Sequence, residues 1–528
     1  MRRFVVRALK AIGLLVFVCA LALGGWLWKG VRDASVDLPP ATAGRYQPSE
    51  SSLNSHRVPA WFADAKFGVF IHWGLFSVPG FAPNGDFTTV LRTDYGRAML
   101  VHPYAEDYWN AIKDPTTPSA AFHRSHYGDM PYQGFARIFE QHLAHWDPDR
   151  WAGIFAAAGA RYVVLVAKYH DGFSLWPTRV PNPHQADWSS RRDVVGELAA
   201  AVRRHGLRFG VYYSGGVDWT FEPRISRTLG DYIGSTPGGD YPAYADAQVR
   251  ELVAQYQPDV LWNDIGWPTD RDSLFRLFAD YYNSHPDGVV NDRWSETNIA
   301  SLLMRPWMSR RLVDLAIEQA LRQNPDALKV MTPPVIPHSD FTTLEYTQYA
   351  EIQSKKWEMT RGIGHSFGYN RNERDSDYAS SEELLREFID AVSKNGNLLL
   401  NVGPTGDTME IPPEQLSRLT DVGRWLRANG EAIYDTVPWR QSDATTADGT
   451  PVRFTRRPDA VNVIVLGRPS GSTLTIRGVA LSGAGRLLSD GSPVAVAVSG
   501  NRTILTCAHP LDGSFAPVVA ITPPASSP

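Results

Sequence analysis

The chain has 528 residues, which is more than one minimal domain and fits a large domain with one smaller unit. Hydrophobic residues make up 43% and charged residues 20%, so most of the chain is expected to fold. The net charge of −4, with no dense Lys/Arg run beyond the N-terminus, argues against nucleic acid as a partner. Two cysteines, Cys19 and Cys507, give no disulfide framework, and no Cys/His cluster has zinc spacing.

The N-terminus carries an export signal. Four basic residues precede a charge-free apolar run from Ala11 to Trp28. Ala20-Leu21-Ala22 offers a cleavage site, but the run continues past it and is near the lower length limit for a membrane span. Residues 1–32 are therefore either a cleaved signal peptide or a retained membrane anchor. Both alternatives place the body outside the cytoplasm, as a periplasmic, cell-surface or secreted protein, after a Pro/Ser/Ala-rich linker over residues 33–54.

Residues 55–438 alternate between short apolar runs and amphipathic segments. The expected strands are Phe67 to Trp73, Tyr162 to Ala167, Phe209 to Ser214, Val260 to Asp264, Val289 to Trp294 and Asn397 to Val402, with a weaker candidate at Lys329 to Met331. Continuous apolar runs are typical of strands buried on both faces of a parallel sheet. The repeat count predicts an α/β domain with a (β/α)8-like barrel. An open doubly wound sheet is the alternative, but its dinucleotide-binding glycine pattern is missing.

The sequence pattern changes near Trp439, where the alternation of strands and helices ends. Short β-rich runs such as Val461 to Leu466 and Arg502 to Cys507 follow, separated by glycine, aspartate and serine. Residues 439–528 are therefore expected to form a small all-β sandwich that supports the larger domain. No carboxylate pair or aromatic platform in this part suggests a site.

Polar side chains stand where the expected strands end. Asp264 ends one strand between Trp262 and Trp267, and His72, His170 and Arg293 stand at the ends of others. In barrels of parallel strands that rim carries the chemistry. Indole rings beside a carboxylate suit a sugar, whose C–H face packs on the ring while its hydroxyls seek polar groups.

Six segments, taken in order, resemble the α-L-fucosidases of glycoside hydrolase family 29 over about residues 55–440, with a looser match beyond. They are Trp61 to Gly74, Tyr162 to Pro177, Phe209 to Ser214, Pro258 to Asp264, Asn291 to Trp294 and Asn397 to Pro404. The resemblance implies a retaining exo-glycosidase that removes terminal α-L-fucosyl residues from oligosaccharides or glycoproteins without a metal or cofactor.

The resemblance also implies residue roles. Asp264 matches the nucleophile, and Glu345 is the candidate general acid/base, with Glu106 as the alternative. The expected sugar-binding residues are His72, Trp73, Glu106, His170, Tyr213, Trp262, Arg293 and Phe367. For a retaining pair, the two carboxyl groups should lie about 5–5.5 Å apart.

Two positions depart from the family pattern. Tyr169 stands where a first of two adjacent histidines is common, and Asp107 stands where an aromatic residue is usual. Tyrosine makes hydrogen bonds but takes up no proton near neutral pH. The same mechanism on a related sugar such as α-L-galactose therefore stays open. A non-catalytic carbohydrate-binding barrel and, because histidines and carboxylates occur together, a metal-dependent hydrolase are further alternatives.

Overall fold

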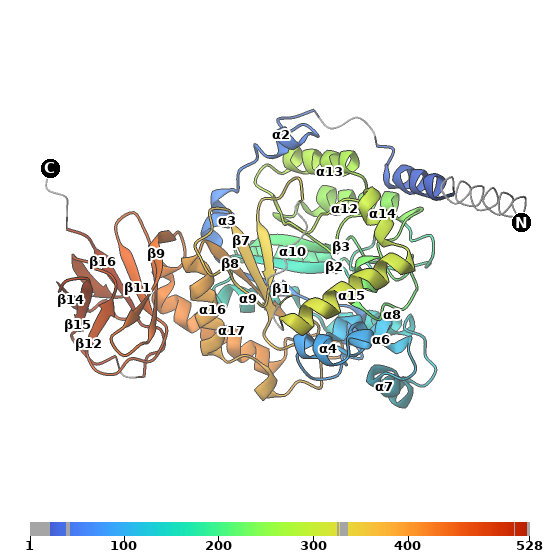
Figure 1. Ribbon diagram of the computed structural model, residues 1–528. Coiled ribbons are helices and arrows are strands. Elements are labelled where there is room, and N and C mark those ends of the chain that lie inside the picture. The colour runs from blue at the N-terminus through green and yellow to red at the C-terminus, as the bar shows by residue number, and fades with distance from the viewer. Residues whose placement is uncertain (1–21, 39–42, 325–326, 328–335, 512, 525–528) are drawn as a thin grey trace, which may run out of the picture.

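The computed structural model describes residues 22–38, 43–324, 327, 336–511 and 513–524. Figure 1 shows a large body of strands and helices, with a small all-β body packed against α16 (Ser381–Ser393) and α17 (Pro413–Asn429). The N-terminal end of the described chain lies on the opposite side of the large body from the all-β body.

Eight parallel strands form a curled sheet in the order β5-β4-β3-β2-β1-β8-β7-β6. Their bounds are β1 (Phe67–Ile71), β2 (Tyr162–Lys168), β3 (Arg208–Ser214), β4 (Val260–Asp264), β5 (Val289–Val290), β6 (Thr342–Glu345), β7 (Trp357–Gly362) and β8 (Gly396–Val402). The expected barrel-like α/β fold is confirmed. The weaker strand candidate at Lys329 to Met331 lies outside the described residues.

Helices connect these strands and cover the sheet. The last helix before β2 is α9 (Pro148–Ala157), and those between later strands are α10 (Val194–Arg204), α11 (Leu229–Ile233), α12 (Tyr241–Tyr256), α13 (Arg271–Ser284), α14 (Ile299–Met304) and α15 (Trp307–Gln323). Shorter helices precede β1 or fill the long connection from β1 to β2: α2 (Glu50–Leu53), α3 (Ala60–Ala65), α4 (Phe87–Thr93), α5 (Ala98–Val101), α6 (Tyr108–Ile112), α7 (Pro118–Tyr127) and α8 (Gly134–His142). Local signals set several starts: Asp147 caps α9 with Pro148 in its first turn, and Ser380 forms a capping box with Glu383 in α16.

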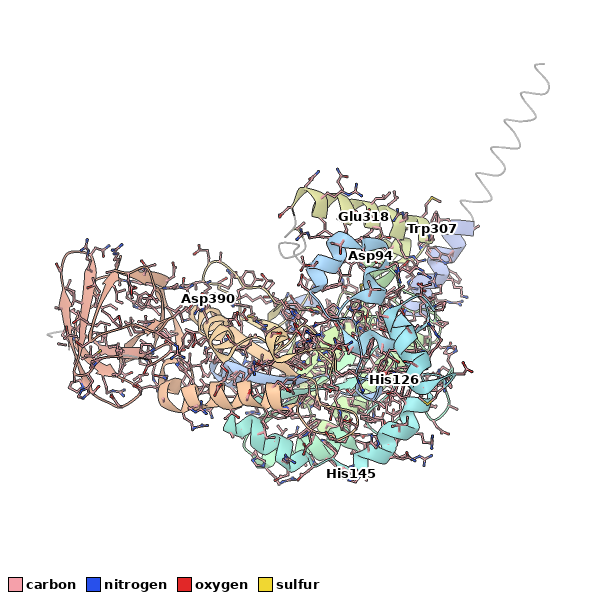
Figure 2. The ribbon with its side chains drawn as sticks, turned by 90° about the horizontal axis from the view of Figure 1, so that it is seen from below. Asp94, His126, His145, Trp307, Glu318 and Asp390 are labelled. Atoms are coloured by element: carbon pink, nitrogen blue, oxygen red, sulfur yellow. The ribbon has the colours of Figure 1, made fainter. Side chains whose placement is uncertain are left out.

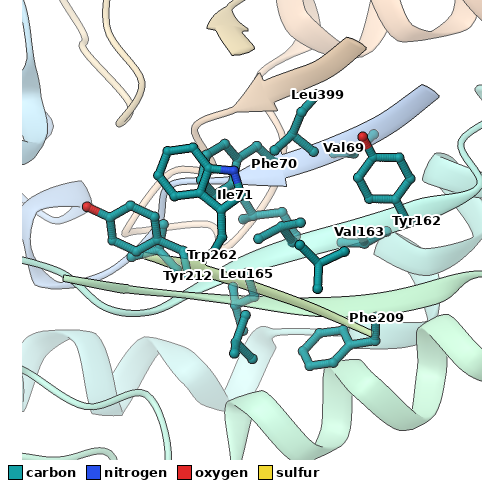
Figure 3. Packing of buried hydrophobic residues seen from close by; sticks show 14 of the residues in the cluster. Val69, Phe70, Ile71, Tyr162, Val163, Leu165, Phe209, Tyr212, Trp262 and Leu399 are labelled. Carbon is teal, nitrogen blue, oxygen red and sulfur yellow. The ribbon is translucent and has the colours of Figure 1, made fainter. Parts of the chain in front are cut away.

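The interior of the curled sheet is closely packed. Every residue of β2 and of β8 is buried, as their continuous apolar runs predict. Figure 3 shows Phe70, Trp262 and Tyr212 packed beside aliphatic residues of neighbouring strands. Gly68 leaves room for the Tyr162 ring, because a Cβ at Gly68 would come within 2.4 Å of that ring. The lower barrel is thus filled, which leaves the carboxyl ends of the strands for a site.

The ring of strands has a seam between β5 and β6, which exchange no strand ladder within the described residues. Individual hydrogen bonds, most of them to the side chains of Asp340 and Asp292, join the two edges instead. Asp340 accepts a 2.8 Å hydrogen bond from the backbone N–H of Val290, and its own N–H donates to the Val290 carbonyl at 3.0 Å. Two residues after Val290, Asp292 accepts hydrogen bonds from the backbone N–H and the hydroxyl of Thr343 on β6.

The C-terminal body is all-β, as expected, but its strands close into one ring rather than forming two separate sheets. The order is β10-β11-β16-β13-β14-β15-β12-β9, with β9 paired to both β10 and β12. The bounds are β9 (Val437–Thr446), β10 (Pro451–Arg456), β11 (Val461–Val465), β12 (Thr473–Arg477), β13 (Ala484–Leu487), β14 (Pro493–Val498), β15 (Arg502–Cys507) and β16 (Val518–Thr522). The ten-residue β9, which pairs with a register shift opposite β10, reaches both edges and so closes the ring.

Residues 22–34 are helical and end the apolar N-terminal run. In the part of the chain that the structure describes, none of the helices is long and apolar enough to cross a bilayer. The basic start and most of the apolar run, residues 1–21, lie outside the described residues.

Candidate active site

A pocket of about 250 Å³ lies at the carboxyl ends of the strands. This is just below the roughly 300–1,000 Å³ of drug-sized ligand sites, so the pocket suits one small ring. Strand ends contribute Phe70, His72, Tyr169, His170, Tyr212, Trp262, Asp264, Ile265, Arg293, Glu345 and Thr360. Helices and loops contribute Phe87, Met99, Tyr104, Glu106, Asp107, Leu229, Tyr232 and Phe367.

Asp264, the last residue of β4, is fixed by three donors. Its Oδ1 accepts hydrogen bonds from Nη1 of Arg293 at 2.9 Å and from the backbone N–H of Ile265 at 3.0 Å. Its Oδ2 accepts one from the Tyr212 hydroxyl at 3.0 Å. The donors hold the carboxylate in one orientation at the pocket wall, and Oδ2, with a single donor, keeps more free lone-pair capacity.

Arg293 joins Asp264 to Glu345. Its Nη2 lies 3.3 Å from Oε2 of Glu345, while Nη1 binds Asp264. Its Nε donates to the Thr343 hydroxyl at 3.0 Å, and its guanidinium carbon lies 4.9 Å from the centre of the Trp262 ring. The two carboxyl groups are therefore held beside one planar cation, a geometry that a lysine could not supply.

Glu345 ends β6 and receives a 3.3 Å hydrogen bond from the Tyr104 hydroxyl. Burial raises the pKa of Glu345; Arg293 opposes that rise and the charge of Asp264 adds to it. About a third of the side chain still faces open space. A carboxyl group with a raised pKa and an open path to a ligand can hold a proton and release it.

The two pocket histidines are hydrogen-bond acceptors at Nε2. Asn401 donates its amide N–H to the Phe367 carbonyl, so its Oδ1 accepts from His72 Nδ1 at 2.6 Å. Ser214 donates its hydroxyl to the Val217 carbonyl, so it accepts from His170 Nδ1 at 2.6 Å. Burial lowers the pKa of His72 to about 4 and also lowers that of His170. Both rings are neutral near pH 7, with the proton on Nδ1 and a lone pair on Nε2.

Glu106 is a second carboxyl group with a raised pKa. Its Oε2 accepts hydrogen bonds from the Gly368 N–H at 2.8 Å and from the Ser366 hydroxyl at 3.2 Å. Burial raises the pKa of Glu106 to about 8, with the charge of Asp107 adding to the rise. Because both donors bind Oε2, the proton of the neutral form belongs on Oε1. Phe367 lies between Ser366 and Gly368 and adds an apolar wall to the pocket.

Trp262 is held from beneath by a buried carboxyl group. Glu358 on β7 accepts hydrogen bonds from Trp262 Nε1 at 3.0 Å and from the Tyr162 hydroxyl at 2.6 Å. Burial raises the pKa of Glu358 to about 7. Glu358 is fully buried inside the barrel, so it positions the indole ring and does not line the pocket.

Known proteins share this arrangement of elements. Residues 36–431 match the family model described as Alpha-L-fucosidase. The chain belongs to the α-L-fucosidase family. Plasma alpha-L-fucosidase of Homo sapiens is 34% identical over 432 residues, which cover 80% of this chain and 78% of that protein. Alpha-L-fucosidase of Dictyostelium discoideum is 30% identical over 461 residues, which cover 82% and 85%.

Solved structures agree. The Thermotoga maritima alpha-fucosidase in complex with a mechanism-based inhibitor is 40% identical, with a TM-score of 0.75, over 90% of this chain and all of that one. The same enzyme in complex with fucose is 40% identical with a TM-score of 0.74, at the same coverage. The resemblance found in the sequence, the glycoside hydrolase class and the barrel fold are thereby confirmed.

The pocket of this α-L-fucosidase family member excludes two of the residues expected to bind sugar. Tyr213 donates its hydroxyl to Gln248 on α12 at 2.9 Å, on the outer side of the sheet. Neighbouring residues of a strand face opposite sides, and it is Tyr212 that faces the pocket. Trp73 packs its ring against Trp151, at 4.8 Å between centroids, and donates to the Thr405 carbonyl. Trp73 therefore belongs to the core.

Tyr212 is a pocket residue that the sequence reasoning missed. Tyr212 pairs with Trp262 in the parallel register of β3 and β4, and their rings stack at 5.4 Å. Paired residues of neighbouring parallel strands face the same side. Tyr212 therefore faces the pocket together with Trp262, but the register that pairs them is known only from the folded structure.

The second missed feature is a buried polar cluster around Asp107. Oδ1 accepts a 2.9 Å hydrogen bond from the Tyr169 hydroxyl, and Oδ2 lies 3.2 Å from His102 Nε2. The Tyr232 hydroxyl lies 3.3 Å from Oδ2. Burial alone would raise the pKa of Asp107, but the hydrogen bonds from His102 and Tyr169 outweigh it and hold this pKa below its ordinary value. His102 and Tyr232 come from loop and helix positions that carried no sequence signal.

The pocket can therefore do two things chemically. Several uncharged groups along its wall have committed their protons to the protein: His72, His170, Tyr169 and Tyr212. Each can still accept a hydrogen bond from a ligand hydroxyl. Asp264 and Glu345 add a fixed carboxylate and a carboxyl group with a raised pKa, which is the pair that glycoside cleavage requires.

Proposed function

We propose that this chain removes terminal α-L-fucosyl residues from oligosaccharides or glycoproteins as a retaining exo-glycosidase. The single observation that carries the proposal is the joining of Asp264 and Glu345 through Arg293 at the floor of a one-ring pocket. A shared guanidinium favours the close carboxyl spacing of retaining enzymes, about 5–5.5 Å, over the wider spacing that admits a water between them. The fucose-bound Thermotoga maritima relative supports the choice of sugar.

In the first step, Asp264 attacks the anomeric carbon through a carboxylate oxygen. The bond between that carbon and the leaving oxygen breaks, and Glu345 transfers its proton to the leaving oxygen. The product is a glycosyl ester of Asp264 and a neutral alcohol. The raised pKa of Glu345 keeps the proton available for this transfer.

In the second step, Glu345 acts as the base. Its carboxylate takes a proton from water, the water oxygen bonds to the anomeric carbon, and the ester bond to Asp264 breaks. Both carboxyl groups return to their starting states. Two displacements at one carbon retain its configuration.

Sugar recognition follows from the acceptor-rich wall. The Nε2 atoms of His72 and His170 accept hydrogen bonds from sugar hydroxyls, and Trp262 offers its ring face to the C–H side of the sugar. Phe367 packs against the methyl group. Glu106, neutral at pH 7, donates from Oε1 to a ring hydroxyl and thereby serves binding rather than proton transfer to the leaving group.

The test is hydrolysis of an aryl α-L-fucoside by the wild type, Asp264→Ala and Glu345→Gln, each with and without azide. Loss of either catalytic carboxyl group, Asp264 or Glu345, should lower kcat at least about 1,000-fold. Azide should restore the activity of Glu345→Gln and yield the α-fucosyl azide, because azide attacks the ester intermediate. Azide should restore the activity of Asp264→Ala and yield the β-fucosyl azide, because azide replaces the missing nucleophile.

Glu106→Gln serves as the matched control, since it changes a second pocket carboxyl group with a raised pKa. It should change KM little, because its amide imitates the protonated carboxyl group, and it should give no azide product. If Glu345→Gln keeps near-normal activity while Glu106→Gln is the variant that azide restores, the acid/base assignment moves to Glu106. If the wild type hydrolyses α-L-galactosides but not α-L-fucosides, the proposed substrate changes to α-L-galactose and the proposed mechanism stays.

We infer that the enzyme works outside the cytoplasm. The support is the basic start followed by the charge-free apolar run from Ala11 to Trp28. Cell fractionation and N-terminal sequencing of the mature protein would test this. Recovery in the cytoplasm with an intact start would contradict it.

A further inference from the structure

Helices α14 and α15 present large apolar side chains to solvent. Trp307 is 68% exposed, Met308 69% and Leu312 65%. Ile299, Leu303 and Leu315 are also exposed. These six residues are called the α14–α15 face. Isolated exposed apolar residues are ordinary, but six of them on two consecutive helices indicate an interaction surface.

The α14–α15 face exists because the other side of α15 is firmly packed. Ile317 and Leu321 are buried in a cluster with residues of α4 and α5. Asp314 is buried and accepts hydrogen bonds from the hydroxyls of Tyr95 and Thr228. Because buried contacts fix the inner side of α15, the helix cannot rotate to bury its outer apolar side chains, and these stay exposed in the folded chain.

The helix of residues 22–34 lies directly beside this face. A Cβ at Gly30 would come within 2.9 Å of the Leu302 methyl groups, so the buried Leu302 side chain of α14 packs directly on Gly30. Figures 1 and 2 both show this helix next to α14 and the Trp307 end of α15. It carries its own exposed apolar residues, among them Leu23, Trp26 and Trp28.

The occupant of this surface is indicated by what precedes it in the chain. The helix of residues 22–34 continues an apolar run without a charge from Ala11 to Trp28. Three exposed basic residues adjoin the apolar residues in sequence: Lys29, Arg32 and Arg311. Arg32 lies 3.6 Å from Asp33 and Arg311 lies 3.5 Å from Glu318, so the charge of Lys29 is the one without a carboxylate in the ion pairs of the described residues. Tryptophans at the edge of an apolar surface, with basic residues beside them, are typical of contact with the headgroup region of a bilayer.

We propose that the α14–α15 face rests in the headgroup region of an anionic phospholipid bilayer, beside an uncleaved N-terminal run that inserts into the same bilayer. The proposal goes beyond the hydrolysis of fucosides and does not depend on it. It assigns the enzyme to the membrane surface through two elements that are distant in sequence and adjacent in space.

The experiment uses the full chain with Cys19→Ser and Leu312→Cys, labelled with a polarity-sensitive fluorophore. Vesicles of phosphatidylcholine with phosphatidylglycerol serve as the probe. Binding should shift the emission to the blue and lower quenching by aqueous iodide about threefold or more, because the label enters the interface. A label at Val498→Cys, 45% exposed on β14 of the C-terminal ring, is the control and should not respond.

A second variant separates the face from the N-terminal run. Trp307→Ser with Met308→Ser in the Leu312→Cys chain should restore iodide quenching of the label while the chain still floats with the vesicles. Hydrolysis of a soluble aryl fucoside should be unchanged, since none of these residues lines the pocket.

Three results would overturn the proposal. In the first, the chain floats with vesicles but the label at position 312 stays fully quenchable. In the second, the label is protected without lipid, which would make a second copy of the chain the occupant. In the third, the full chain does not bind vesicles at all.

Discussion

The hydroxyl of Tyr169 donates a 2.9 Å hydrogen bond to Oδ1 of Asp107, so the two residues that depart from the family pattern contact each other. An aromatic residue at position 107 could not accept this bond, and a carboxylate there needs donors around it. The two departures therefore compensate each other. Because its proton is committed to Asp107, the Tyr169 oxygen can only accept from a sugar hydroxyl.

This pairing predicts strong coupling between Tyr169 and Asp107. Tyr169→Phe should lower kcat/KM on an aryl α-L-fucoside about tenfold, the equivalent of about 1.4 kcal/mol for a lost hydrogen bond. Asp107→Asn should cause a similar loss. The double variant should lose less than the sum, with a coupling energy of about 0.5–3 kcal/mol. Additive losses would show that the two side chains act independently.

Arg293→Lys should lower kcat at least about 100-fold, because an ammonium group cannot hold Asp264 and Glu345 in one plane at once. Steady-state kinetics and the free energy of unfolding should both be measured. Arg250→Lys is the matched control, since Arg250 also bridges two carboxylates, Asp246 and Asp280, away from the pocket. Equal effects on kcat in both variants would argue against a special role for Arg293.

Glu358→Met should lower the free energy of unfolding by about 3 kcal/mol or more, since it leaves the buried Trp262 N–H and Tyr162 hydroxyl without an acceptor. It should also raise KM, because Trp262 loses its support. Glu358→Gln is the control and should be mild: its amide oxygen can accept from Trp262, while the Tyr162 hydroxyl turns to accept from its amide N–H. Urea unfolding and KM measure both. Equal losses for the two variants would contradict the argument.

Glu106 should make the protein less stable as the pH rises. Its pKa is about 8 in the folded state and near 4.5 when unfolded, so the folded state binds the extra proton between these values. The stability it contributes is present below about pH 4.5 and is lost as the pH rises toward 8, by up to about 5 kcal/mol. Glu106→Gln imitates the protonated form and should escape this loss.

Urea unfolding of the wild type and Glu106→Gln at pH 5 and pH 9 measures the difference. The variant should gain stability relative to the wild type at pH 9. Glu351→Gln, a change at an exposed residue, should track the wild type at both pH values. A pH-independent difference between wild type and Glu106→Gln would show that Glu106 keeps an ordinary pKa.

The sequence predicts the sheet and the rim residues for the same physical reason. Runs such as Tyr162 to Ala167 are apolar throughout because both faces of the strand are buried. Polar residues are therefore found where the strand ends. This rule located His72, His170, Asp264 and Arg293, all of which line the pocket. It says where a side chain stands along the chain, and the barrel then brings the ends together.

The same reasoning fails where the decision depends on tertiary contacts. Tyr212 and Tyr213 are identical residues, and only the strand register decides which one faces the pocket. Tyr232 reaches the pocket from α11, whose position depends on packing against α15. The closed C-terminal ring likewise depends on the pairing of β9 with both β10 and β12, which no local pattern encodes.

The seam between β5 and β6 has a mechanical consequence. Arg293 follows one of its edges and Glu345 ends the other. The spacing between Glu345 and Asp264 is therefore set across a seam that a few individual hydrogen bonds close, without a strand ladder. The single connection between these two edges carries α14 and α15. The segment that carries α14 and α15 is therefore also the chain's covalent link between the strand that precedes Arg293 and the strand that ends in Glu345.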